Sequence, residues 1–200
     1  MFSIKKAMIN GEKDNVVKYY DESKIIIKNM SNTIDDFTNF FKPDKAKVYF
    51  NIANSINESI SILDRVITHE MINITTDLQD IEVLGTTNEL SQVIINLINN
   101  SKDAFVQNSI LIKEINISTK IENNYALIEI EDNAGGIKLK SIYKIFEPYF
   151  TTKHTTQGTG LGLFMSKMIC EQGFHGSLDV KTHKNTTTFI IKIPLEEKDA

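Results

Sequence analysis

The residues best suited to chemistry begin with glycines, since five of the nine in the chain lie between residues 135 and 162. Three of them, Gly158, Gly160 and Gly162, occur in GTGLGLFMSKMI and run directly into a predicted helix. Free N–H groups and the dipole at a helix N-terminus bind anions such as phosphate. The G-x-G-x-G spacing matches neither the dinucleotide fingerprint nor a P-loop. We predict an anion site suited to phosphate here. A flexible glycine-rich lid also fits this stretch and does not exclude phosphate binding.

A second glycine-rich stretch, ALIEIEDNAGGI, places Asp132 at the end of a predicted strand, just before Gly135 and Gly136. Glycine is costly unless the backbone needs a positive φ or a close approach to another group. A carboxylate in this position can accept a hydrogen bond from the edge of a flat ligand that lies over the glycines. An Asx turn, in which Asp132 binds its own backbone, explains this stretch more simply when it is taken alone.

The third feature is a pair of amides in NLINNSKDA. Asn96 and Asn100 are four residues apart, so they lie on one face of the predicted helix. Their carbonyl oxygens suit Mg²⁺, which takes one or two protein oxygens together with phosphate oxygens. Surface polarity or capping would explain residues 99–101. It explains Asn96 poorly, because that residue interrupts an apolar run and a buried amide needs a partner.

The elements that must position these residues follow from periodicity. Helix patterns occur at residues 52–70, 87–108, 138–146 and 161–172. Strand patterns occur at 47–52, 72–78, 81–85, 110–122, 124–132, 176–183 and 186–195. Strands that follow one another, with helices between the groups, predict an α+β fold with one mixed sheet and helices on one face.

The N-terminal segment has a different pattern. Its apolar residues recur at spacings of three, four and seven, which predicts an amphipathic helix that ends at Pro43. The residues of this stripe are Val16, Tyr20, Ile27, Met30, Ile34, Phe37 and Phe41. Such a helix must pack on another helix or a second chain, or else lie on the globular domain. We expect a helical region at 1–44 and a globular domain at 45–200.

Composition limits the remaining possibilities. Two hundred residues that are 41% hydrophobic can bury a real core, and the net charge of −4 argues against a nucleic-acid partner. A single cysteine, Cys170, excludes a disulfide framework and a cysteine-rich metal site, and favours a cytoplasmic location. No apolar run is long enough to predict a membrane-spanning helix.

Taken in order, these motifs resemble a known family. Residues 89–163 resemble the ATP-binding module of sensor histidine kinases, in the superfamily shared with gyrase, mismatch-repair and heat-shock chaperone ATPases. NLINNSKDA is similar to the N box, EDNAGGI to the first glycine box and GTGLGL to the second, with KIFEPYFTTK between them similar to the F box. The resemblance implies a Bergerat-type sandwich, a mixed sheet packed on one layer of helices.

The resemblance also implies roles. Asp132 would accept the adenine amino group of ATP, while Asn96 and Asn100 would act as catalytic residues that hold Mg²⁺ on the triphosphate. Ala134 departs from the family, which often has glycine there, and we expect binding to survive because alanine is small. The other residues implied in nucleotide binding are Gly136, Ile137, Phe150, Lys153, Gly158, Thr159, Gly160, Leu161, Gly162 and Leu163.

Asn96 bears on the reaction, because the hydrolase branches of the superfamily carry a glutamate there as general base. Asparagine cannot take a proton from water, so we expect transfer of the γ-phosphoryl group to a histidine. None of the four histidines has an H-[ED]-x-x-x-P setting, since His69-Glu70 lacks the proline. We therefore expect the acceptor upstream of Met1 in a longer kinase.

The segment NMSNTIDDFTNFFKPDK is similar to the end of a dimerisation hairpin. It implies a homodimer in the full protein, and relay of the phosphoryl group to the receiver domain of a response regulator. A hydrolase of the same superfamily, a non-catalytic nucleotide- or partner-binding module, and an anti-sigma-type serine kinase are the alternatives.

Overall fold

The computed structural model describes residues 15–21, 23–24, 27, 31, 46–139, 141–152 and 159–196. The chain divides into two compact units, which we describe separately. The larger comprises Asp44–Phe146 with Gly162–Ala200, and the smaller Met1–Pro43 with Glu147–Leu161. The larger unit therefore contains Asn96, Asn100 and Asp132.

In the smaller unit, the described residues between 15 and 31 are helical, as the periodicity predicted. Tyr20 and Ile27, two residues of the apolar stripe, are 61% and 67% exposed. The other predicted stripe residues from Met30 onward lie outside the described residues, as do Lys153 and Gly158. The packing partner of this helix stays a prediction.

In the larger unit, groups of helices are separated by strands that mostly follow one another in pairs. Its helices are α3 (Ile52–Ile62), α4 (Asp64–His69), α5 (Thr87–Gln107), the 3₁₀ helix η1 (Ile142–Phe146), α6 (Gly162–Met168) and the π-type turn η2 (Ile169–Gly173). Its strands are β1 (Val48–Asn51), β2 (Ile72–Asp77), β3 (Glu82–Gly85), β4 (Lys113–Glu122), β5 (Tyr125–Asp132), β6 (Ser177–His183) and β7 (Thr186–Pro194).

Five strands form a mixed sheet in the order β2-β4-β5-β7-β6, in which β2 and β4 are parallel and the other pairs antiparallel. The turn between β4 and β5 has Asn123 and Asn124 at φ 50° and 62°, the conformation of a two-residue hairpin turn. This turn sets the register of β4 on β5, which pairs Asp132 with Ile115. On its other side, β5 pairs with β7, where Thr187 lies opposite Asp132.

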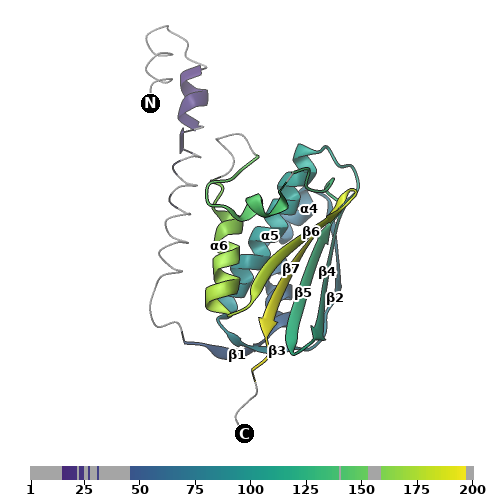
Figure 1. Ribbon diagram of the computed structural model, residues 1–200. Coiled ribbons are helices and arrows are strands. Elements are labelled where there is room, and N and C mark those ends of the chain that lie inside the picture. The colour runs from purple at the N-terminus through teal and green to yellow at the C-terminus, as the bar shows by residue number, and fades with distance from the viewer. Residues whose placement is uncertain are drawn as a thin grey trace. The chain divides into compact units, whose positions relative to one another are not determined.

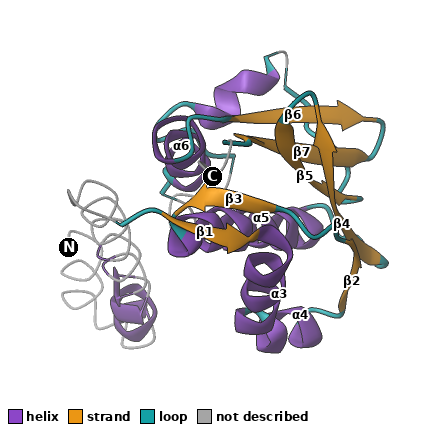
Figure 2. Cartoon of the chain, turned by 90° about the horizontal axis from the view of Figure 1, so that it is seen from below, coloured by secondary structure: helices purple, strands orange, loops and turns teal. Residues whose placement is uncertain are grey.

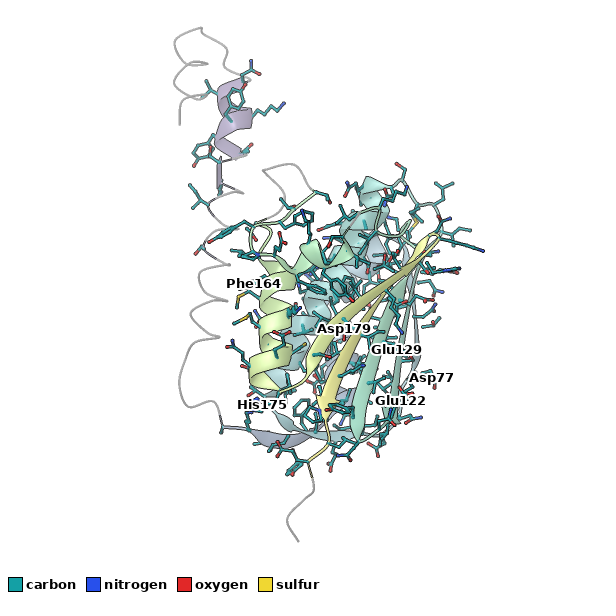
Figure 3. The ribbon with its side chains drawn as sticks, in the orientation of Figure 1. Asp77, Glu122, Glu129, Phe164, His175 and Asp179 are labelled. Atoms are coloured by element: carbon teal, nitrogen blue, oxygen red, sulfur yellow. The ribbon has the colours of Figure 1, made fainter. Side chains whose placement is uncertain are left out.

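The helices cover one face of this sheet, as Figures 1 and 2 show for α3, α5 and α6. Alternation along β5 sends Ile128 and Ile130 into the core, where they are 0% and 1% exposed. From α5, Leu90, Ile94 and Leu97 are each 0% exposed. On the other face, Lys120 and Glu129 form an ion pair at 3.1 Å, and Figure 3 marks Glu129 and Asp179 there. The predicted α+β sandwich is confirmed.

Details differ from the prediction. The helix expected at 52–70 breaks at Leu63, and the strands expected at 47–52 and 81–85 form a separate antiparallel pair, β1 with β3. Gly85 in that pair has the ring of Phe174 against its Cα, so close that a Cβ there would lie 2.3 Å from the ring. Packing of this kind depends on residues distant in the chain, which periodicity does not report.

Candidate functional site

Asp132 is the last residue of β5, and its carboxylate is held on both oxygens. Oδ2 accepts a hydrogen bond from Ser101 Oγ of α5 at 2.7 Å, and Oδ1 accepts one from the Ala134 amide at 2.9 Å. The second bond is the Asx turn that the sequence left open as an alternative. A carboxylate has about four acceptor positions, so these two bonds leave capacity for a ligand donor.

Burial sets the electrostatics of this carboxylate. Asp132 is 4% exposed, and burial raises the pKa of its carboxyl above the ordinary 3.8. The hydrogen bonds from Ala134 and Ser101 oppose this rise in pKa, while the charge of Glu131 adds to it. Because the Asp132 carboxylate is partly desolvated and held in place, it is suited to accept a hydrogen bond from a donor on the edge of a flat ligand.

The loop after Asp132 is bound to two neighbouring segments. The Gly135 amide donates to Asn185 O at 2.9 Å, and the Ile137 amide donates to Thr182 Oγ1 at 3.0 Å. Asn108, which ends α5, donates to Ala134 O at 2.6 Å. Gly136 has φ 69°, and a Cβ there would lie 2.6 Å from Lys184 O. The loop therefore requires glycine at this position.

Asn96 lies at the middle of α5 and faces α6. Its Nδ2 donates to Ser166 Oγ at 2.7 Å, which supplies the partner that the apolar setting demanded. Gly162, the first residue of α6, lies so close that a Cβ there would be 2.4 Å from Asn96 Oδ1. Asn100 and Leu163 are half-buried. The predicted residues Asn96 and Gly162 are thus brought together.

Four other predicted residues belong to the smaller unit. The Phe150 amide donates to Glu147 O at 3.2 Å, and the Leu161 amide to Thr159 Oγ1 at 3.4 Å. Gly160 has φ 67°, and a Cβ there would lie 2.5 Å from the carbonyl carbon of Tyr149. The two described ends of this glycine-rich segment therefore touch each other.

Sequence reasoning missed both serines. Ser101 and Ser166 are each 2% exposed and bind the side chains of Asp132 and Asn96. For Ser166 the available signal was the one that identified Asn96, namely a polar residue inside an apolar stretch of helix. Ser101 stands in the polar run NNSKD, which gives no such signal. Phe146 of the F box is also buried, packed edge-to-face on Phe189 and under the Lys167 ammonium, 5.0 Å from its ring centre.

The comparisons with known proteins bear on this arrangement. Residues 85–197 match the family model described as "Histidine kinase-, DNA gyrase B-, and HSP90-like ATPase", which is more than half of the 200 residues. The chain belongs to this family. As a member of this family, it carries an ATP-binding domain.

Two similar proteins indicate the branch of this family to which the domain belongs. Sporulation kinase B of Bacillus subtilis strain 168 is 28% identical over 182 residues, which cover 88% of this chain and 41% of that kinase. The solved catalytic domain of the histidine kinase ThkA superposes with a TM-score of 0.66 at 27% identity, covering 75% of this chain and 96% of that one. The chain thus carries the ATP-binding catalytic domain of a sensor histidine kinase, and spans less than half of its curated relative.

A third comparison concerns the fold alone. The histidine kinase ThkA, solved in complex with the response regulator protein TrrA, superposes with a TM-score of 0.71 at 22% identity. The superposition covers 96% of this chain and 57% of that one. Among the described residues, no helix is both long and apolar enough to cross a bilayer.

Proposed function

We propose that this domain transfers the γ-phosphoryl group of Mg–ATP to a histidine side chain. The main support for this proposal is the asparagine at position 96. The residue is an amide whose nitrogen is bound to Ser166. An amide cannot act as the general base that activates water, whereas phosphoryl transfer asks mainly for positioning and charge neutralisation. The two carboxylates on α5 make other contacts, since Glu89 lies by Gly173 and Asp103 contacts Lys102.

Asp132 is proposed to read the adenine base. The Ser101 hydroxyl and the Ala134 amide orient its carboxylate, so that a remaining lone pair can accept a hydrogen bond from the adenine amino group. Gly136 and Ile137 continue the same loop and would let the base lie close to the backbone. A preorganised acceptor of this kind orients the nucleotide before phosphoryl transfer.

Asn96 and Asn100 are proposed to hold Mg²⁺ on the triphosphate. The donor set fits, because both residues offer carbonyl oxygens from one face of α5, and the Asn96 nitrogen already has its partner in Ser166. When bound, Mg²⁺ would neutralise charge on the phosphate oxygens. The protein contributes the fixed oxygens, and Gly162 permits the close approach of α6 to Asn96.

The remaining roles rest on the motif resemblance. They comprise nucleotide contacts by Leu163 and by the lid residues Phe150, Lys153, Gly158, Thr159, Gly160, Leu161 and Gly162. We place the acceptor histidine outside this chain, in a dimerisation hairpin of which 1–44 would be the end, with 45–200 as the ATP-binding domain. We also propose that the full protein is a homodimer in the cytoplasm, and that a response-regulator receiver domain accepts the phosphoryl group from the histidine.

One incubation tests the reaction. The chain is mixed with Mg²⁺ and γ-labelled ATP, and bound nucleotide, labelled protein and free phosphate are followed together. We expect bound nucleotide with neither labelled protein nor phosphate release, and transfer of label when a hairpin with an acceptor histidine is added. Steady phosphate release would replace the proposal by the hydrolase reading, and label on the chain alone would place the acceptor within it.

A further inference from the structure

Ser166 is a second polar side chain inside an apolar helix. It lies on α6 between Met165 and Lys167 and is 2% exposed. Its hydroxyl oxygen accepts the 2.7 Å hydrogen bond from Asn96 Nδ2, across 70 residues of sequence. The side chain of Asn96 is thereby bound to α6, the helix that begins at Gly162.

The two ends of the Asn96 amide lie in different surroundings. The nitrogen faces Ser166, while the oxygen faces Gly162, one turn earlier on α6. A Cβ at Gly162 would lie 2.4 Å from Asn96 Oδ1 and 3.2 Å from Nδ2. The carbonyl end is therefore turned toward the start of α6, and a hydrogen bond at the opposite end holds it there.

The orientation matters because the two ends of an amide bind opposite charges. A carbonyl oxygen is a ligand for a hard cation, whereas an NH₂ group is a donor that repels one. We infer that Ser166 is a positioning residue that fixes the Asn96 amide with its oxygen toward the metal and phosphates. This inference rests on the proposed function of Asn96 and adds a residue that acts through it.

The same bond could serve only to join α5 to α6. In that case its loss would lower the free energy of unfolding and leave the response of nucleotide binding to Mg²⁺ unchanged. In the positioning role, loss of the hydroxyl frees the amide to rotate, and partners that orient a metal ligand usually change metal affinity by roughly 10–100-fold. The two roles therefore differ in the Mg²⁺ dependence.

The test measures the affinity of the chain for ADP by calorimetry, with Mg²⁺ and with EDTA. We expect Ser166→Ala to reduce the gain in affinity that Mg²⁺ provides by roughly 10-fold, and to leave the affinity in EDTA unchanged. The matched control is Ser59→Ala, which removes the same atom from a buried site on α3, where Ser59 Oγ donates to Ser55 O at 2.7 Å. The control should keep the full Mg²⁺ effect.

Asn96→Ala distinguishes a failure of the metal role of Asn96 from a failure of the positioning role of Ser166. If it leaves the Mg²⁺ effect intact, the metal role proposed for Asn96 is wrong. If Asn96→Ala removes the effect but Ser166→Ala behaves like Ser59→Ala, the positioning role of Ser166 is wrong and the role of Asn96 stands. When both hold, the double variant should lose no more of the Mg²⁺ effect than Asn96→Ala alone, because coupled residues are not additive.

Discussion

Asp132 and Asn96 are each bound to a serine at 2.7 Å, yet the fold holds them by different means. Asp132 is fixed by strand pairing on both sides of β5, by its own Asx turn and by Ser101 of α5. Asn96 projects from α5 toward α6 and is held by one side-chain bond. The proposed adenine end, at Asp132, is thus built by backbone register, and the proposed phosphate end, at Asn96, by the contact of two helices.

Gly136 and Gly162 show the same difference between backbone and side-chain contacts. At the adenine end, Gly136 faces a backbone carbonyl, Lys184 O, and has a left-handed φ of 69°. At the phosphate end, Gly162 faces the side chain of Asn96 within a regular helix. Backbone cannot yield to an added methyl group, whereas a side chain can rotate away. The adenine end should therefore tolerate change less well.

The largest effect on stability is expected for Gly136→Ala. The added Cβ meets backbone at 2.6 Å and the left-handed φ is strained for alanine, which together should lower the free energy of unfolding by about 3 kcal/mol. Urea denaturation measures this directly. A loss below that of Gly162→Ala would contradict the claim that the adenine end is the more rigid one.

Gly162→Ala should cost less stability. The clash with Asn96 Oδ1 opposes the substitution, while alanine gains up to about 1 kcal/mol of helix propensity over glycine, so the net loss should be about 1 kcal/mol. Its functional effect should be sharper, since the displaced amide no longer presents its oxygen. The check is ADP affinity with and without Mg²⁺, and an unchanged ratio would show that Asn96 can move without consequence.

The smallest effect concerns pH. An acid whose pKa is raised by folding binds its proton more tightly in the native state, so stability falls as pH rises from 3.8 through the raised value. Asp132→Asn should remove this fall, because an amide keeps both neighbours as partners without a charge. The measurement is the free energy of unfolding across about pH 4 to 7.

The control is Asp77→Asn, the same chemical change at an exposed residue that ends β2. It should leave the fall in stability over this pH range intact. If the two variants show the same pH dependence, burial of Asp132 is not the cause.

Much of this arrangement could be predicted from sequence, because the features involved are local. The spacing of Asn96 and Asn100 on one helix face and the alternation of the two strands that precede Asp132 are properties of short stretches. They predicted α5, β5 and the β4–β5 hairpin nearly to the residue.

What escaped prediction depends on distant contacts. Ser166 meets Asn96 across 70 residues and Ser101 meets Asp132 across 31, so no local pattern pairs them. The separate pair of β1 and β3 also involves a distant contact, because Gly85 of β3 lies against the ring of Phe174. An isolated polar residue in an apolar helix predicts that a hydrogen-bond partner exists, but does not identify that partner.

The proposed hydrogen bond between Asp132 and the adenine amino group is tested most directly by the ratio of ATP to ITP affinity. Inosine carries a carbonyl where adenine has the amino group, so the wild-type carboxylate should favour ATP and repel ITP. Asp132→Asn offers a donor as well as an acceptor, and should lower the ATP-to-ITP ratio at least 10-fold, a change of about 1.4 kcal/mol. An equal ratio in the two proteins would contradict the assignment of Asp132 to the base.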